Sequence, residues 1–112
     1  MKTSNCPTLF FDVVSAFVTD VNGLYNEAIE AFKDDRLPDE EFEKLDEIYD
    51  TVLESVTLYM VGEMSENDFL RNLYNKTKEA QMNVNTIYTN SAFDLLSTTY
   101  VELAEINLCI KP

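Results

Sequence analysis

The fold is decided by residues 37–69, which read LPDEEFEKLDEIYDTVLESVTLYMVGEMSENDF. They contain two helix starts of the same kind, each a short acidic turn between two apolar residues. Leu37 and Phe42 enclose the first turn, and Met64 and Phe69 enclose the second. Apolar residues in such a pair pack together as a hydrophobic staple, and acids in the first turn are stabilised by the helix dipole. We therefore expect one helix to begin just after each start.

Between the two starts, apolar residues recur every three or four positions, which is the period of a helix with one buried face. These residues are Phe42, Leu45, Tyr49, Val52, Val56 and Met60. Gly62 follows them, at the position where a residue of left-handed conformation commonly ends a helix. The pattern predicts a helix over residues 39–61.

The same period continues toward the N-terminus, where it predicts a longer helix over residues 8–33. Its apolar residues are Phe10, Val13, Val14, Phe17, Val21, Leu24, Ala28 and Phe32. Asn22 and Gly23 interrupt this pattern, and glycine costs about 1 kcal/mol relative to alanine in a helix interior. We expect a tolerated irregularity there, with a kink or close packing as the alternative.

Toward the C-terminus the pattern is thinner. A Ser N-cap at residue 65 and apolar residues that continue to Val84 and Ile87 predict a third helix over residues 66–88. Ser91 and Asp94 then have capping-box spacing, which predicts a fourth helix over residues 92–109. No Gly or Pro enforces a break between these two, so a single kinked helix is the alternative.

The four predicted helices span residues 8–33, 39–61, 66–88 and 92–109. A chain of 112 residues has room for one core, so we expect a single domain. Short connections make consecutive helices antiparallel neighbours. The sequence therefore predicts an all-α fold, a small antiparallel bundle of about four helices.

The composition excludes most catalytic and metal sites. The chain has no histidine, which removes the Ser/His/Asp and Cys/His arrangements and the Glu-x-x-His pairs of di-iron bundles. Its two glycines, Gly23 and Gly62, are too few for a phosphate-binding loop. We expect a protein that is not an enzyme and that holds no metal or cofactor.

Targeting and redox signals are equally sparse. The apolar stretch 9–18 contains Asp12 and follows a single basic residue, so it does not resemble a signal peptide, and no run is long enough for a membrane span. We expect a cytoplasmic protein with no membrane contact. Reduced thiols at Cys6 and Cys109 are then expected, although an antiparallel bundle would also bring them to one end, where a disulfide is the alternative.

The charge is concentrated in one part of the chain. The net charge is −13, and residues 27–54 contain twelve acids against three bases, an excess of nine. The acids are Glu27, Glu30, Asp34, Asp35, Asp39, Glu40, Glu41, Glu43, Asp46, Glu47, Asp50 and Glu54. Residues 69–112 have equal numbers of acids and bases. One hairpin of the bundle is therefore expected to produce a strong negative potential, which argues against direct nucleic-acid binding.

Three interpretations of this acidic stretch are open. It is a solvated surface that keeps the protein soluble, the usual role of such a charge run. Alternatively it docks on a partner protein with a basic surface, where carboxylates stand in for phosphates and inhibit a nucleic-acid-handling enzyme. The third is divalent-ion binding at Asp34, Asp35, Asp39, Glu40 and Glu41, which lack the spacing of an EF-hand loop and would bind only weakly and without selectivity.

A second candidate surface lies in residues 81–101, where Asp94 is the only charge. Aromatic and Met side chains with few charges are typical of protein interfaces. Met82, Tyr88, Phe93 and Tyr100 are therefore candidates for a self-association or partner face, with core packing as the alternative.

Together these features favour an acidic protein-binding module that acts as an inhibitor, with a self-associating structural or scaffolding subunit as the alternative. Small acidic proteins without motifs are also common among phage accessory proteins, an association that no motif here supports.

Overall fold

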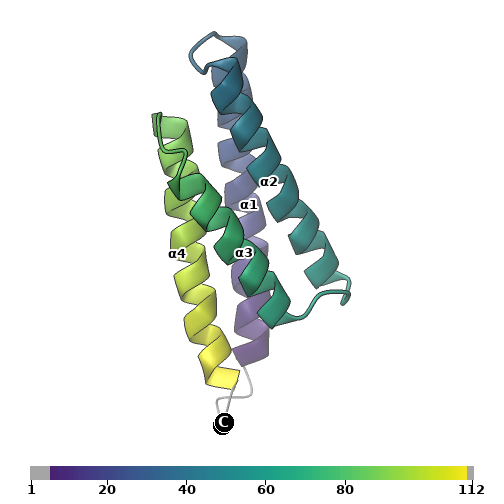
Figure 1. The fold of residues 1–112 in the computed structure, drawn as a ribbon. Helices are drawn as coiled ribbons and strands as arrows, with labels where there is room; N and C mark the ends of the chain where they lie inside the picture. The colour runs from purple at the N-terminus through teal and green to yellow at the C-terminus, as the bar shows by residue number, and fades with distance from the viewer. Residues whose placement is uncertain (1–5, 111–112) are drawn as a thin grey trace.

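In the computed structural model, which describes residues 6–110 and the side chains of residues 9–108, four helices are joined by short connections (Figure 1). The helices are α1 (Cys6–Lys33), α2 (Asp39–Met60), α3 (Glu66–Gln81) and α4 (Ile87–Ile110). Consecutive helices run in opposite directions, and both α1 and α3 pack against α2 and α4. The predicted antiparallel all-α bundle is confirmed, and no strand occurs within residues 6–110.

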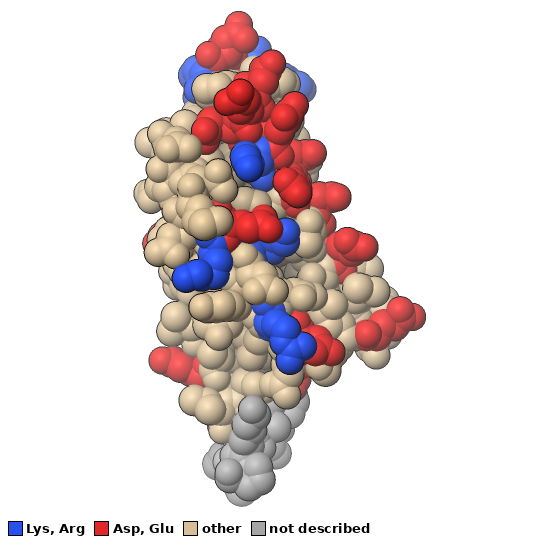
Figure 2. Space-filling model, viewed as in Figure 1, with Lys and Arg blue, Asp and Glu red and all other residues tan. Residues whose placement is uncertain are grey.

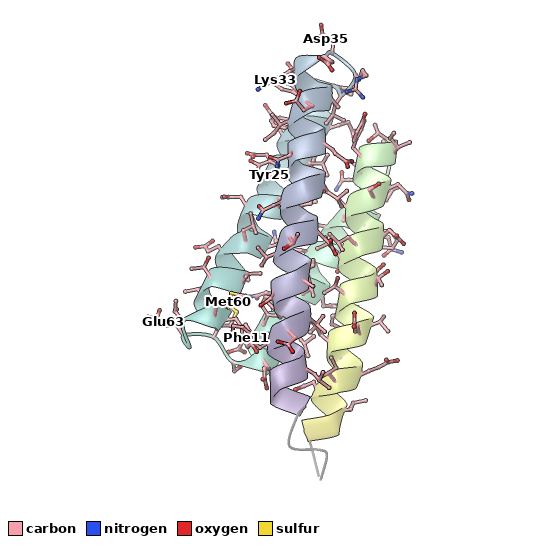
Figure 3. All side chains as sticks on the ribbon, turned by 180° about the vertical axis from the view of Figure 1, so that it is seen from behind. Phe11, Tyr25, Lys33, Asp35, Met60 and Glu63 are labelled. Atoms are coloured by element: carbon pink, nitrogen blue, oxygen red, sulfur yellow. The ribbon has the colours of Figure 1, made fainter. Side chains whose placement is uncertain are left out.

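The core runs along the bundle and takes residues from every helix. Its largest fully buried side chains are Phe10, Val14, Phe17, Val21, Leu45, Tyr49, Phe69, Leu96 and Leu103. The predicted stripes of the first two helices therefore face inward within the described side chains, apart from one residue of α2. Met60 is 37% exposed, because α2 leans away from α1 toward its last turn (Figure 3). The neighbouring Tyr59 fills the space instead, with its ring centroid 5.4 Å from that of Phe10 and 5.5 Å from that of Phe69.

Helices α1 and α2 end in the same way, with a Schellman motif. After α2, Gly62 has a φ of 85°, its N–H donates to the Tyr59 carbonyl at 3.1 Å, and the Glu63 N–H donates to Leu58 at 2.8 Å. After α1, the left-handed position is held by Asp35, with a φ of 61°. These 6→1 and 5→2 bonds satisfy carbonyls that the helix leaves without partners. The predicted C-cap at Gly62 is confirmed, whereas the equivalent role of Asp35 has no glycine to signal it.

The boundary between α3 and α4 differs from the prediction. Helix α3 ends at Gln81 rather than residue 88, and α4 begins at Ile87 rather than residue 92. Thr86 and Thr89 form a reciprocal cap: the Thr89 N–H donates to Thr86 Oγ1 at 3.1 Å, and the Thr86 N–H donates to Thr89 Oγ1 at 2.9 Å. This cap starts the helix earlier than the predicted box at Ser91 would. Val84 and Ile87, expected in the stripe of the third helix, are exposed as a result.

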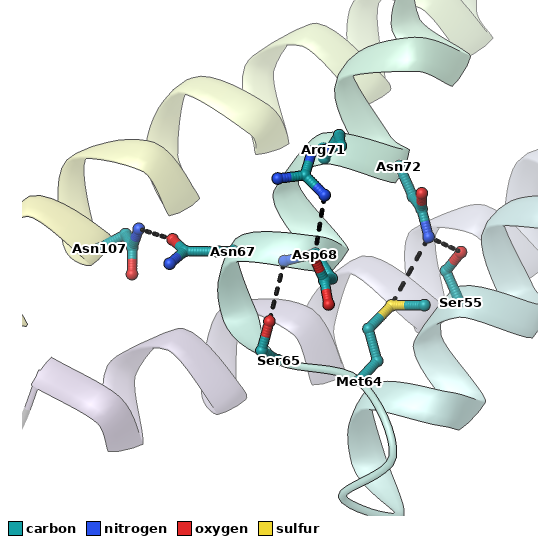
Figure 4. Close-up of polar contacts among 8 residues, drawn as sticks. All are labelled: Ser55, Met64, Ser65, Asn67, Asp68, Arg71, Asn72 and Asn107. Carbon is teal, nitrogen blue, oxygen red and sulfur yellow. Dashed lines mark hydrogen bonds and ion pairs between the residues drawn. The ribbon is translucent and has the colours of Figure 1, made fainter.

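Polar side chains join α3 to its neighbours (Figure 4). Ser65 caps α3 as predicted, because its Oγ accepts a hydrogen bond from the Asp68 N–H at 3.1 Å. The buried Asn107 of α4 donates from its amide to Asn67 Oδ1 at 2.8 Å. Asn72 reaches across to Ser55 of α2 at 3.5 Å. These contacts fix the register of a helix whose apolar stripe is thin.

Helix α1 is continuous through Asn22 and Gly23, so the expected irregularity there is tolerated without a break. A Cβ built on Gly23 meets no atom within 4 Å, which excludes close packing inside this chain as the reason for the glycine. Reduced thiols or a disulfide are the two alternatives for Cys6 and Cys109, and both side chains lie outside the described set. In the described part of the chain, none of the helices combines the length and apolar character that a bilayer crossing requires.

Candidate protein-binding surface

The acidic residues gather over the α1–α2 hairpin. Figure 2 shows them at the end of the molecule where α1 turns into α2 and along the outer side of α2. Of the twelve predicted acids, ten are exposed, and Glu41 and Asp46 are half-buried. We call the ten exposed ones the acidic face; they are Glu27, Glu30, Asp34, Asp35, Asp39, Glu40, Glu43, Glu47, Asp50 and Glu54. The side of the molecule formed by α4 carries much less charge in the same view.

Part of the acidic face is an ordered row. Glu43, Glu47, Asp50 and Glu54 are separated by four, three and four residues, so they project from one side of α2, opposite its buried residues. At a rise of 1.5 Å per residue, the row is about 16 Å long. The helix that carries it is anchored by Leu45, Ile48, Tyr49, Val52 and Val56, which are buried in the core. The row is therefore held on a rigid support.

The two half-buried acids are tied into the fold. Asp46 accepts a hydrogen bond from the Tyr25 hydroxyl and so joins α2 to α1. This bond, together with burial, raises the pKa of Tyr25 to about 12. Glu41 Oε2 accepts from the Asn85 amide at 3.1 Å, and Glu41 Oε1 is buried without a hydrogen-bond partner among the described residues. Both carboxylates hold the bundle together rather than lying open to a partner.

Burial also raises the pKa of two other tyrosines, Tyr49 and Tyr59. It raises the pKa of Tyr49, with a smaller contribution from the negative charge of Glu27, and it raises the pKa of Tyr59, to which Glu66 adds. All these shifts favour the neutral phenol. The tyrosines therefore act as apolar packing groups with a polar tip rather than as acids or bases near neutral pH.

The predicted low-charge face is not one surface. Met82 is 78% exposed in the connection before α4. Tyr88, Phe93 and Tyr100 are partly buried against the core. Tyr88 lies beside α1, and its hydroxyl accepts a hydrogen bond at 2.6 Å from Arg36 in the turn that follows α1. Tyr100 packs instead against Tyr74 of α3, with ring centroids 5.5 Å apart. The structure therefore does not bring the four residues together.

A groove between α1 and α4 was not expected from the sequence. We call it the α1–α4 groove; it has a volume of about 510 Å³ and is lined by Thr19, Asp20, Gly23, Leu24, Glu27, Ser91, Asp94, Leu95 and Thr98. Four lining residues of each helix follow the spacing i, i+3, i+4, i+7, beginning at Asp20 in α1 and at Ser91 in α4. This shared spacing is the only sequence pattern by which the lining residues could have been predicted. It is not sufficient, because the sequence does not say which outer faces of α1 and α4 lie side by side.

A second groove continues the first toward the hairpin. It has a volume of about 380 Å³, is lined by Asn26, Glu27, Glu30, Arg36 and Tyr88, and shares Glu27 with the α1–α4 groove. Arg36 lies in it and pairs with Asp34 at 3.2 Å as well as with the Tyr88 hydroxyl. This part of the seam between α1 and α4 therefore holds a guanidinium that the chain itself supplies.

The acids at the hairpin turn do not assemble into a metal site. Within the described residues, no three carboxylate or thiol side chains are grouped as metal ligands would be, and this includes the candidates Asp34, Asp35, Asp39, Glu40 and Glu41. What the surface offers is a set of separate carboxylates on rigid helices and an acidic groove beside them. Comparison of the chain with protein-family models, with curated proteins and with solved structures finds no match.

Proposed function

We propose that the chain is a non-enzymatic acidic protein-binding module whose acidic face docks on a basic surface of a partner protein. The observation that carries this proposal is the row Glu43, Glu47, Asp50 and Glu54, which stands on the outer side of a helix fixed by its buried residues. A rigid row loses little conformational freedom on binding, so more of the electrostatic attraction is retained as affinity.

The partner's surface that suits this face best is one that binds nucleic acid. The row places a carboxylate about every 5 Å along the helix, compared with a phosphate about every 3.4 Å along one strand of DNA. Acids around the hairpin turn extend the same negative field beyond the row (Figure 2). A protein that covers a phosphate-binding groove in this way inhibits the enzyme that uses it. The field also steers association, which makes binding dependent on ionic strength.

The matched test compares two variants of equal charge. Glu43→Gln, Glu47→Gln and Glu54→Gln together remove three charges from the row. Glu63→Gln, Glu102→Gln and Glu105→Gln remove three exposed charges elsewhere. An exposed charge at an interface contributes about 0.5 kcal/mol, so the first variant is expected to bind a basic partner about tenfold more weakly. The control is expected to stay within about twofold of the unmodified protein.

The partner is obtained by affinity capture from lysate at low salt and at about 0.5 M salt, with mass spectrometry of the bound proteins. Recovery of a basic nucleic-acid-handling protein that is lost at high salt, and lost with the row variant but not with the control, supports the proposal. Equal recovery with both variants contradicts it. Glu41 is left unchanged in these variants because its carboxylate is part of the fold.

The second candidate is a structural subunit that self-associates. It is favoured by Met82 and Ile87, two large apolar side chains that are 78% and 71% exposed where α3 connects to α4. Apolar burial is insensitive to salt, so this association would persist at about 0.5 M salt. Sedimentation of the protein with and without Met82→Lys and Ile87→Lys tests it. A monomer at all concentrations removes this candidate.

A further inference from the structure

The α1–α4 groove carries negative charge that nothing within it balances. Asp20 and Glu27 stand on the α1 side and Asp94 on the α4 side, and all three are exposed. No Lys or Arg is among the residues that line the groove. None of the three carboxylates takes part in an ion pair or side-chain hydrogen bond found in the described residues. Charge complementarity therefore selects a cationic occupant.

The spacing of the charges selects the form of that occupant. Asp20 and Glu27 are seven residues apart on α1, which is about 10 Å along the helix axis. A partner helix with basic residues at i and i+7 presents two cations at the same separation on one side. Between the acids lie Leu24 and Leu95, which are half-buried and give the groove an apolar floor. Antiparallel α1 and α4 run side by side here, so a third helix can lie along their seam (Figure 3).

Gly23 is the residue that this chain's own packing leaves unexplained. It is exposed in the interior of a 28-residue helix, where alanine is more favourable, and an added Cβ has nothing within 4 Å. The methyl group would therefore stand in the groove without touching this chain. A glycine at such a place permits another backbone to approach closely. It lies between Asp20 and Glu27, where a helix bound to both would come nearest to α1.

The neighbouring groove shows that this seam accommodates a cation. There the side chain of Arg36 lies among Glu27, Glu30 and Tyr88 and donates to the Tyr88 hydroxyl at 2.6 Å. The α1–α4 groove repeats that combination of carboxylates and hydroxyls, with Ser91 and Thr98 supplying the hydroxyls. It differs in having no arginine of its own.

We propose that the α1–α4 groove, which Asp20, Glu27 and Asp94 make acidic and Gly23 keeps open, seats an α-helix of the partner protein with basic residues at i and i+7. The proposal rests on the proposed function, since it assumes a basic protein partner, and it names the element of that partner which is bound. Asp20 and Asp94 lie outside the predicted acidic stretch, so this is a site distinct from the row on α2.

The test uses the full chain and a fluorescent alanine-rich helical peptide with arginines at two positions seven residues apart, kept soluble by glutamines. Fluorescence anisotropy at low salt measures its affinity. Gly23→Ala is expected to weaken binding at least about fivefold while raising the Tm by a few degrees, because alanine stabilises the helix but blocks the groove. Asp94→Asn is expected to weaken binding about threefold through the loss of one charge.

Asn22→Ala is the matched control, because it also favours the helix but adds no atom to the groove. It is expected to raise the Tm and leave the affinity within about twofold. A peptide with glutamine in place of arginine is expected not to bind. If the arginine peptide does not bind, or binds Gly23→Ala and Asp94→Asn like the unmodified protein, the groove proposal is wrong.

The α2 row variant separates this outcome from the proposed function. If removing the row charges abolishes partner capture while the groove variants bind the peptide normally, the acidic face is the docking surface and the groove is not. If the groove variants lose the peptide while the row variant captures the partner normally, the groove is supported and the role of the row is rejected.

Discussion

Replacing Asp35 by glycine is expected to stabilise the protein, although it removes an exposed side chain of the turn between α1 and α2. Asp35 holds the left-handed position of the Schellman motif after α1, with a φ of 61°. The motif depends on that conformation, because the Asp35 N–H donates to the Phe32 carbonyl at 3.2 Å and the Arg36 N–H to Ala31 at 2.8 Å. The conformation is therefore required, whatever residue occupies the position.

The magnitude follows from two opposing effects. A residue with a Cβ costs about 1–2 kcal/mol in the left-handed region, and aspartate lies toward the low end of this range because its short side chain forms local hydrogen bonds. Glycine avoids that cost. It also gives the unfolded chain more conformational freedom, which lowers the free energy of unfolding by about 0.4–1 kcal/mol and so offsets part of the gain. The net gain for Asp35→Gly is therefore small, up to about 0.6 kcal/mol in the free energy of unfolding. For a domain of this size that corresponds to a rise of up to about 3 °C in Tm.

The assay is chemical denaturation followed by circular dichroism, with Asp34→Gly as the control. Asp34 is the residue before Asp35, and it lacks a positive φ. Its replacement removes the same charge and adds the same chain freedom without relieving any backbone strain, so it is expected to be neutral or destabilising. Asp34→Gly also removes the exposed ion pair with Arg36, which contributes about 0.5 kcal/mol and adds to the expected loss of stability in the control. If both variants change stability equally, or if Asp35→Gly is the less stable, the account of this turn is refuted.

The remaining predictions concern hydrogen bonds that tie the helices together. Tyr25→Phe removes the bond to Asp46 and is expected to cost about 0.5–1.5 kcal/mol near neutral pH. Because folding raises the pKa of Tyr25 from about 10 to about 12, the stability that it contributes is complete below pH 10 and is lost as the pH rises toward 12. Denaturation at pH 8 and pH 11 should therefore show the two proteins becoming closer in stability, and a constant difference would contradict the linkage. Thr89→Val keeps the shape of a buried side chain but leaves two backbone N–H groups, those of Asn85 and Thr86, without their acceptor. Thr89→Val is expected to lower the free energy of unfolding, measured by urea denaturation, by about 2 kcal/mol. The control Thr98→Val, at an exposed position, should change it by less than about 0.5 kcal/mol. Equal effects of the two substitutions would show that the cap does not start α4.

The helix starts that were read from the sequence are correct because their signals are local. The acidic turn after Leu37 and the Ser65 cap each act over a few neighbouring residues, and α2 and α3 begin where these signals place them. Gly62 is equally local, since a glycine at this position adopts the left-handed conformation without strain. Such elements depend little on what packs against them.

The boundary between α3 and α4 could not be decided in the same way. Two capping signals compete within a few residues, one at Thr86 and one at Ser91, and no Gly or Pro separates them. Starting α4 at Ile87 leaves Thr89 and Ala92 buried within the bundle. Packing of the other helices therefore selects the earlier cap, and a sequence pattern contains no information on that packing.

The sequence likewise predicts part of the candidate surfaces, and tertiary packing decides the rest. The concentration of acids in residues 27–54 is a property of the sequence, and its exposure on the hairpin follows from the helical period of α2. Which acids are withdrawn from that surface does not follow, because the partners of Asp46 and Glu41 lie 21 and 44 residues away. The separation of Tyr88 from Tyr100 likewise arises because α4 packs against both α1 and α3, with Tyr88 beside α1 and Tyr100 against Tyr74 of α3.

By itself the sequence determined that this chain forms four helices with one acidic hairpin, because helical period, caps and charge act within a helical turn or a short segment. Only the tertiary structure decided that Asp20, Gly23 and Glu27 of α1 face Ser91 and Asp94 of α4 across a groove. The physical reason is that a groove needs two helix faces at a particular rotation and register. Both are set by the fit of core side chains, such as Phe17 and Val21 of α1 and Leu96 of α4, and not by any spacing along the chain.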